Sequence, residues 1–299
     1  MNRREFIHDV GAVGAALSLP VSFAAATMPT MKMATRPIPG TGEPLPVVGL
    51  GNSQSFRDRD YQNSEKLLDI LLSHGGSLVD SWSSNQEVLG RYMHEHDAKR
   101  KLFLANNVGA DNQQDRDAAI RYAKETQGKA VLDLLQLPNP SNFKKQWRLM
   151  RSAKDDGHAR FIGMAISRKR YYDTVEKLLE SGTTDFIQIN YSILEPESGK
   201  RLLPLARDKG VAVVINRPFV NGEYFPRVRD KELPAWAADF DCESWAQFSL
   251  KFILANPAVN CVITETSKAK HATDNLSAGF GRLPDEKTQA EMQRLLQSF

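Results

Sequence analysis

Short apolar runs alternate with longer segments of helical periodicity along most of this chain. Each run has only four to six residues and is mostly apolar, which is typical of strands buried on both faces. The runs are Val47–Leu50, Ser77–Asp80, Leu102–Ala105, Leu132–Leu137, Phe161–Met164, Phe186–Asn190, Val211–Ile215 and Val259–Ile263. Between them lie amphipathic segments such as Ser64–Leu72, Tyr172–Glu180 and Trp245–Leu254, which predict helices.

Repeated strand–helix units favour parallel strands joined by right-handed crossovers, and eight of them close into a barrel of about this length. We therefore predict an α/β fold, a (β/α)8 TIM barrel. The alternative is a doubly wound open sheet, which would need a glycine-rich phosphate turn that Gly49-Leu-Gly-Asn52 does not complete. Two additions are predicted: an N-terminal β-hairpin around Arg36–Pro44 and a C-terminal helix over Pro284–Gln297.

The first residues have the pattern of an export signal. Arg3 and Arg4 precede Phe6, an uncharged stretch rich in Ala and Gly begins at Val10, and small residues end it at Ala26. The arrangement resembles a bacterial twin-arginine signal, with a short N-terminal helix as the alternative. We expect a signal over 1–26, a barrel over 27–299, and a periplasmic or otherwise extracytoplasmic protein. No later segment has the ~18 continuous apolar residues of a membrane span, so we expect no membrane contact after signal removal.

Composition narrows the classes of partner. The 299 residues carry a net charge of only +3, and the positive charges are scattered, which gives no reason to expect nucleic acid. The two cysteines, Cys242 and Cys261, are too few for a disulfide scaffold; we expect free thiols, with a single bridge as the alternative. No group of histidines, cysteines and carboxylates has metal-ligand spacing, so we predict no metal.

In such a barrel the chemistry lies where the strands end. The motifs around those ends resemble the aldo-keto reductases from about Arg36 to Leu295. The matching segments are Leu45–Gly51, Leu132–Leu137, Gly157–Gly163, Asp185–Ser192 and Ile263–Lys268, the last followed by His271, Asp274 and Asn275. The resemblance implies hydride transfer from NADPH to a carbonyl, with a tyrosine as general acid, a lysine that lowers its pKa, an aspartate that pairs with the lysine, and a histidine that orients the substrate.

Only the aspartate of that catalytic set is matched, by Asp80. Counting without a gap places Asn85 at the tyrosine position, and a gapped alignment places Trp82 there. The lysine position holds Asn107 and the histidine position holds Pro138. None of these replacements can donate a proton near neutral pH, so we expect ordinary carbonyl reduction to be lost or strongly impaired.

The resemblance implies a cofactor site that is partly kept. Gln188 matches the residue that would hold the nicotinamide carboxamide, whereas Asn216 stands where an aromatic ring would stack on it. Residues for the adenosine end are Ser267, Lys268 and Lys270 for a 2′-phosphate and Asn275 for the adenine. Glu265 replaces a glycine and places negative charge beside the phosphates. NADP(H) therefore remains an open expectation.

Other residues are left with alternatives. Without a lysine, Asp80 needs neutral donors or a raised pKa, and we predict that Asn107 lies within ~4 Å as one such donor. Arg217 either binds a carboxylate or phosphate, and so joins the cofactor-site residues, or pairs with Asp80 or Glu265. Trp82 and Trp147 are interpreted as packing residues, with a ligand platform as the alternative.

Two functions follow. One is an exported NADP(H)-dependent oxidoreductase of aldo-keto reductase descent, acting through a rebuilt site. The other is a pseudoenzyme: a catalytically silent periplasmic barrel that binds a small anionic ligand or a protein partner. A soluble nicotinamide cofactor is not expected to be regenerated outside the cytoplasm, which favours the second function for the actual chemistry and the first for how the chain is classified.

Overall fold

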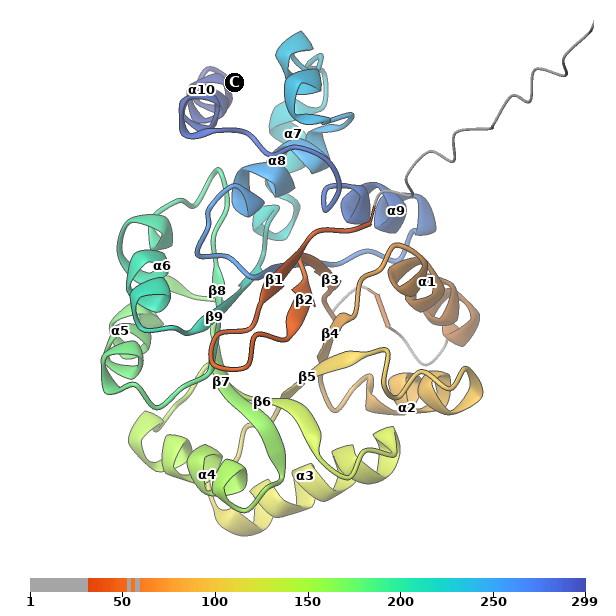
Figure 1. Ribbon diagram of the computed structural model, residues 1–299, viewed down its shortest axis with the longest axis vertical. Coiled ribbons are helices and arrows are strands. Elements are labelled where there is room, and N and C mark those ends of the chain that lie inside the picture. The colour runs from red at the N-terminus through yellow and green to blue at the C-terminus, as the bar shows by residue number, and fades with distance from the viewer. Residues whose placement is uncertain (1–31, 53–54, 57–59) are drawn as a thin grey trace, which may run out of the picture. The chain divides into compact units, whose positions relative to one another are not determined.

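The strands of the chain close into a parallel barrel. The computed structural model describes residues 32–52, 55–56 and 60–299, so the predicted export signal lies outside the described residues. Neighbouring strands follow the order β10-β3-β4-β5-β6-β7-β8-β9, and every pair is parallel. Figure 1 shows the helices arranged around these strands. The predicted (β/α)8 barrel is confirmed, and the open doubly wound sheet is wrong.

Each barrel strand overlaps one of the predicted apolar runs. The strands are β3 (Val48–Leu50), β4 (Leu78–Ser81), β5 (Phe103–Asn107), β6 (Leu132–Pro138), β7 (Ala159–Ala165), β8 (Phe186–Asn190), β9 (Ala212–Asn216) and β10 (Cys261–Thr264). Nearly all their residues are buried, because the barrel interior covers one face and the helices cover the other.

The longer helices lie outside the barrel. They are α1 (Tyr61–Ser73), α2 (Gln86–Glu95), α3 (Gln113–Gln127), α4 (Phe143–Asp155), α5 (Tyr172–Ser181), α6 (Ser198–Asp208), α8 (Trp245–Leu254), α9 (Ala269–Ser277) and the predicted C-terminal helix α10 (Glu286–Gln297). Several begin at a residue whose side chain accepts from a free backbone N–H, such as Asn112, Ser244 and Asp285. No helix among the described residues is long and apolar enough to cross a bilayer.

The predicted hairpin closes the end of the barrel at which the strands begin. It consists of β1 (Thr35–Pro37) paired antiparallel with β2 (Pro44–Pro46). Ile38 and Leu45 belong to the same apolar cluster as the inward-facing Phe103, Phe161 and Phe186, and Figure 1 shows the hairpin in front of the strands. This end is therefore filled by side chains and leaves the opposite end for a site.

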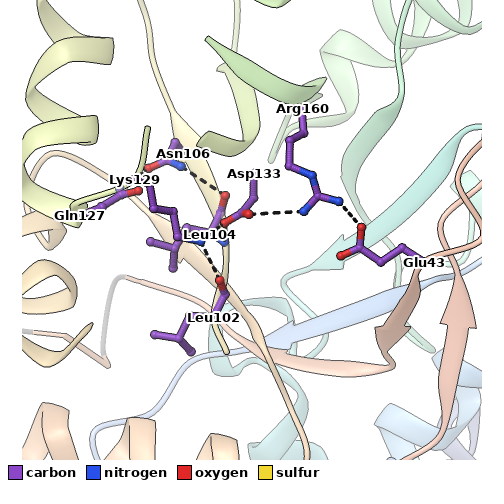
Figure 2. A network of polar contacts seen from close by, with 8 residues as sticks. All are labelled: Glu43, Leu102, Leu104, Asn106, Gln127, Lys129, Asp133 and Arg160. Carbon is purple, nitrogen blue, oxygen red and sulfur yellow. Dashed lines mark hydrogen bonds and ion pairs between the residues drawn. The ribbon is translucent and has the colours of Figure 1, made fainter. Parts of the chain in front are cut away.

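A polar network links this hairpin to the barrel (Figure 2). Arg160 on β7 pairs with Glu43 of the hairpin and lies 3.5 Å from Asp133 on β6. Asp133 also pairs with Lys129, whose Nζ donates to the Leu102 carbonyl at 2.8 Å. Lys129 and Asp133 are nearly buried, whereas Arg160 and Glu43 are about 40% exposed. Because the network lies at the end where the strands begin, we assign it to stability.

Both cysteines are free, as predicted, and both are buried. Burial raises the pKa of Cys242 to about 11 and also raises that of Cys261. The alternative of a bridge between them is wrong.

Candidate active site at the barrel mouth

Polar side chains occupy inward-facing positions near the ends of the barrel strands. Side chains on a strand alternate between its two faces, so a polar residue two positions after an inward-facing apolar residue also points into the barrel. The inward-facing apolar residues are Leu78, Phe103, Leu134, Phe186 and Val214. The polar residues at the same parity are Asp80, Asn107, Gln136, Gln188 and Asn216. The barrel interior therefore changes from apolar to polar toward the mouth.

A cavity of about 900 Å³ opens at this end. Its lining includes several residues singled out from the sequence. These residues are Asp80, Trp82, Gln188, Asn216, Arg217 and Glu265. Phe219 and Phe225 line another part of it, with ring centroids 4.8 Å apart. The volume lies within the range of small-molecule sites.

Asp80 is the buried carboxylate of this cavity, with 5% of its surface exposed. Trp82 Nε1 donates to its Oδ2 at 2.9 Å, and Asn107 Nδ2 donates to its Oδ1 at 2.7 Å. The predicted contact with Asn107 is confirmed. Burial raises the pKa of Asp80 to about 6, against smaller opposing effects of these two donors.

The structure distinguishes Asn85 from Trp82, the two residues that the alternative alignments place at the tyrosine position. Asn85 is fully buried within its loop, where its side chain accepts from the Trp82 N–H at 2.7 Å and donates to the Asp80 carbonyl at 3.2 Å. Trp82, by contrast, lines the cavity. The loop therefore brings the indole, rather than the Asn85 amide, beside the carboxylate.

Several buried side-chain amide atoms near the strand ends have no hydrogen-bond partner within the part of the chain that the structure describes. They include Gln188 Oε1, Asn107 Oδ1, Asn216 Oδ1 and both polar atoms of Gln136. Sequence reasoning missed Gln136, although its position two residues before Pro138 on β6 gives it the inward parity. Because unpaired buried polar atoms are costly, they indicate a need for ligand or water.

Arg217 follows β9 at the edge of the cavity. Its Nη1 donates to the Ser167 carbonyl at 2.8 Å and its Nε donates to Asn221 Oδ1 at 3.2 Å. Asp80 instead takes its hydrogen bonds from Trp82 and Asn107, so an Arg217–Asp80 ion pair is not formed.

The remaining predicted residues are not part of the cavity lining. Ser267, Lys268 and Lys270 are exposed at the start of α9, and Asn275 is buried on the same helix. Pro138 ends β6 and is half-buried. Trp147 is buried on α4 and donates to Thr183 Oγ1 at 3.0 Å, as expected of a packing residue.

One group of potential metal ligands was not expected from the sequence. Glu65, Glu95 and His96 bring their ligand atoms within 4.8 Å of one another on the outer surface. His96 pairs with Glu65 at 2.8 Å, and Glu95 accepts from Tyr61 at 2.6 Å and from Arg91 at 2.8 Å. These contacts account for the group as surface ion pairing.

Comparison with known proteins identifies the family. The model of the aldo/keto reductase family matches residues 47–294, so the chain belongs to that family. The chain is 35% identical over 74 residues to the NADH-specific methylglyoxal reductase of Escherichia coli K12, which is 25% of this chain and 22% of that relative.

Solved structures agree on the fold. An aldo-keto reductase of Bacillus halodurans in its holo form superposes with a TM-score of 0.73 at 17% identity, covering 88% of this chain and 96% of that one. An aldo-keto reductase of Klebsiella pneumoniae in complex with NADPH also reaches 0.73, at 16% identity, covering 89% and 95%. At such identities the likeness shows the fold alone.

Proposed function

We propose that this chain is an exported aldo-keto reductase barrel that binds a small anionic ligand in its mouth and has lost ordinary carbonyl reduction. The observation that carries the proposal is the surroundings of Asp80. Its two oxygens accept from an indole N–H and an amide N–H, where the family resemblance implies a tyrosine and a lysine. Neither group transfers a proton near neutral pH, and a general acid typically contributes roughly 10²–10⁴-fold in rate.

A second candidate is an NADP(H)-dependent oxidoreductase acting through a rebuilt site. It is supported by the unpartnered Gln188 Oε1, which suits the N–H groups of a carboxamide, and by the NADPH complex of the Klebsiella pneumoniae relative. Lys268 and Lys270 supply exposed cations for a phosphate. Gln188, Lys268 and Lys270 thus fit the binding of the cofactor, which would supply a hydride when bound, whereas Asn216 and Glu265 in the cavity lining do not. Carbonyl reduction also needs a general acid that protonates the product oxygen, and among the matched catalytic positions only Asp80 carries an acidic group.

Two measurements separate the candidates. The purified protein is extracted for bound NADP(H), and NADP(H) is titrated by fluorescence, for which Trp82 in the cavity is a reporter. NADPH oxidation is then followed with a panel of aldehydes. We expect no aldehyde-dependent turnover. Robust turnover would overturn the first candidate, and the absence of both bound and titratable cofactor would overturn the second.

Export is tested separately from ligand binding. In the intact cell, the change of Arg3 and Arg4 to lysine should keep the protein in the cytoplasm if the twin-arginine route carries it. The matched control carries Lys99→Arg and Arg100→Lys, at two exposed positions. Export that persists in the first variant would contradict the route.

A further inference from the structure

Two oxygen atoms on side chains lining the cavity require hydrogen-bond donors. Asn216 Nδ2 donates to the Ile166 carbonyl at 2.9 Å, which fixes the amide and leaves Oδ1 as the free acceptor. The Gln188 amide lies close enough to Asp80 to lower its pKa slightly, which leaves Gln188 Oε1 as the second acceptor. Asp80 adds carboxylate oxygens to the same cavity. Hydroxyl groups are donors that suit all three residues.

Arg217 supplies the opposite property, which is positive charge with free donors. A guanidinium has five N–H bonds, and Arg217 uses one on Nη1 and the one on Nε within the described part of the chain. Nη2 and one N–H of Nη1 remain, and the described residues offer Arg217 no ion pair. This set is sufficient for the two oxygens of a carboxylate.

The loop that carries Arg217 is held in an unusual conformation. Arg217, Val220 and Asn221 have φ of 50°, 50° and 54°, a region that a β-branched residue such as Val220 seldom adopts. Ser249 Oγ donates to the Pro218 carbonyl at 3.1 Å and ties the loop to α8. The strain is therefore maintained by packing, and the arginine is positioned rather than free to move in solvent.

From these features we propose that the cavity binds a hydroxylated carboxylic acid, with its carboxylate on Arg217 and its hydroxyl groups on Asp80, Gln188 and Asn216. The inference rests on the proposed function and names its ligand. The described lining sets Arg168 and Arg217 against Asp80 and Glu265, so its formal charges balance and leave no excess positive charge for a doubly charged ligand. A phosphate monoester would bring about −1.5 to −2.

Calorimetric titration of the purified protein tests both halves of this ligand. The probes are gluconate, sorbitol (hydroxyl groups without a carboxylate), hexanoate (a carboxylate without hydroxyl groups) and glucose 6-phosphate. We expect gluconate to bind at least about ten-fold more tightly than the other three, since sorbitol lacks the anion, hexanoate lacks the hydroxyl groups, and glucose 6-phosphate brings close to two negative charges.

Variants assign each half to its residues. Arg217→Gln should weaken gluconate at least about ten-fold and leave sorbitol within two-fold, whereas Asn216→Ala should weaken gluconate and sorbitol but not hexanoate. Arg148→Gln, on an exposed arginine of α4, is the matched control and should change none of these affinities. Arg217→Lys, which keeps the charge, should recover part of the gluconate affinity and guards against a folding defect in Arg217→Gln.

Several results would overturn the proposal. If gluconate fails to bind, or binds no more tightly than sorbitol, the cavity does not recognise a carboxylate. If glucose 6-phosphate binds more tightly than gluconate, the recognised anion is a phosphate. Equal losses of gluconate and sorbitol in Arg217→Gln would contradict the placement of the carboxylate. The proposed loss of carbonyl reduction is tested by aldehyde-dependent NADPH oxidation, and the ligand is tested by calorimetric titration. The failure of one proposal is therefore distinguishable from the failure of the other.

Discussion

The replacement Asp80→Asn probes the cost of burying a carboxylate that has only neutral donors. The pKa of Asp80 is raised by burial from 3.8 to about 6 in the folded chain, which is about two units. One unit corresponds to about 1.4 kcal/mol, so ionising this group in the folded protein costs about 3 kcal/mol of stability. Asparagine is neutral at every pH and avoids this cost.

The sign of the pH dependence follows from the raised pKa. The folded state keeps the Asp80 proton at pH values where the unfolded chain has released it, so the favourable contribution is complete below about pH 3.8 and is lost as the pH rises through about 6. The stability of Asp80→Asn relative to the unmodified protein should therefore increase by about 2.5 kcal/mol between pH 4 and pH 8. A pH-independent offset from altered hydrogen bonds does not affect this slope.

Urea unfolding at pH steps between 4 and 8 measures the slope, with the change in free energy taken at constant m-value. Asp230→Asn, on an exposed aspartate, is the matched control for the loss of a carboxylate. Trp82→Phe removes one donor to the carboxylate and should move the transition to higher pH. A flat or falling difference for Asp80→Asn would refute the reasoning, since it would mean that Trp82 and Asn107 outweigh burial.

Two further predictions concern the frame of the barrel. Asp133→Asn should lower the free energy of unfolding by about 3 kcal/mol, because it leaves the nearly buried Lys129 without its counter-charge, whereas Glu43→Gln, at an exposed pair, should cost less than about 1 kcal/mol. Urea midpoints check this, and equal costs would contradict it. Cys242 and Cys261 should react slowly with a thiol reagent at pH 8 in the native protein and rapidly in urea, because burial raises both pKa values. Fast native labelling of either would argue against a buried thiol.

The barrel was predictable because buried parallel strands impose a pattern on the sequence. Runs such as Leu132–Leu137 are apolar throughout, since β6 is covered on both faces, and the segment Trp245–Leu254 coincides with α8. Prediction was poorer at the strand ends. The strand predicted over Val259–Ile263 begins two residues earlier than β10. Val259 and Asn260 are buried like strand residues but are not part of the strand.

The site was only partly predictable. The position of Asp80 at a strand end, and its need for a neutral donor, led correctly to Asn107. Gln136 was overlooked because a glutamine inside an apolar run carries no local signal of its own, and only the parity of β6 gives it meaning. The partners of Arg217 were also beyond the sequence, since the Ser167 carbonyl comes from a loop 50 residues away.

The sequence by itself determined the closed barrel, its hairpin and its C-terminal helix, because hydrophobic periodicity and turn residues act locally and repeat along the chain. Only the tertiary structure decided that Trp82, and not Asn85, faces the cavity from the loop after Asp80. It also decided which amide oxygens remain unpaired and where the charge of Arg217 is held. These features depend on distances between side chains from different strands, and such distances exist only once the barrel has closed.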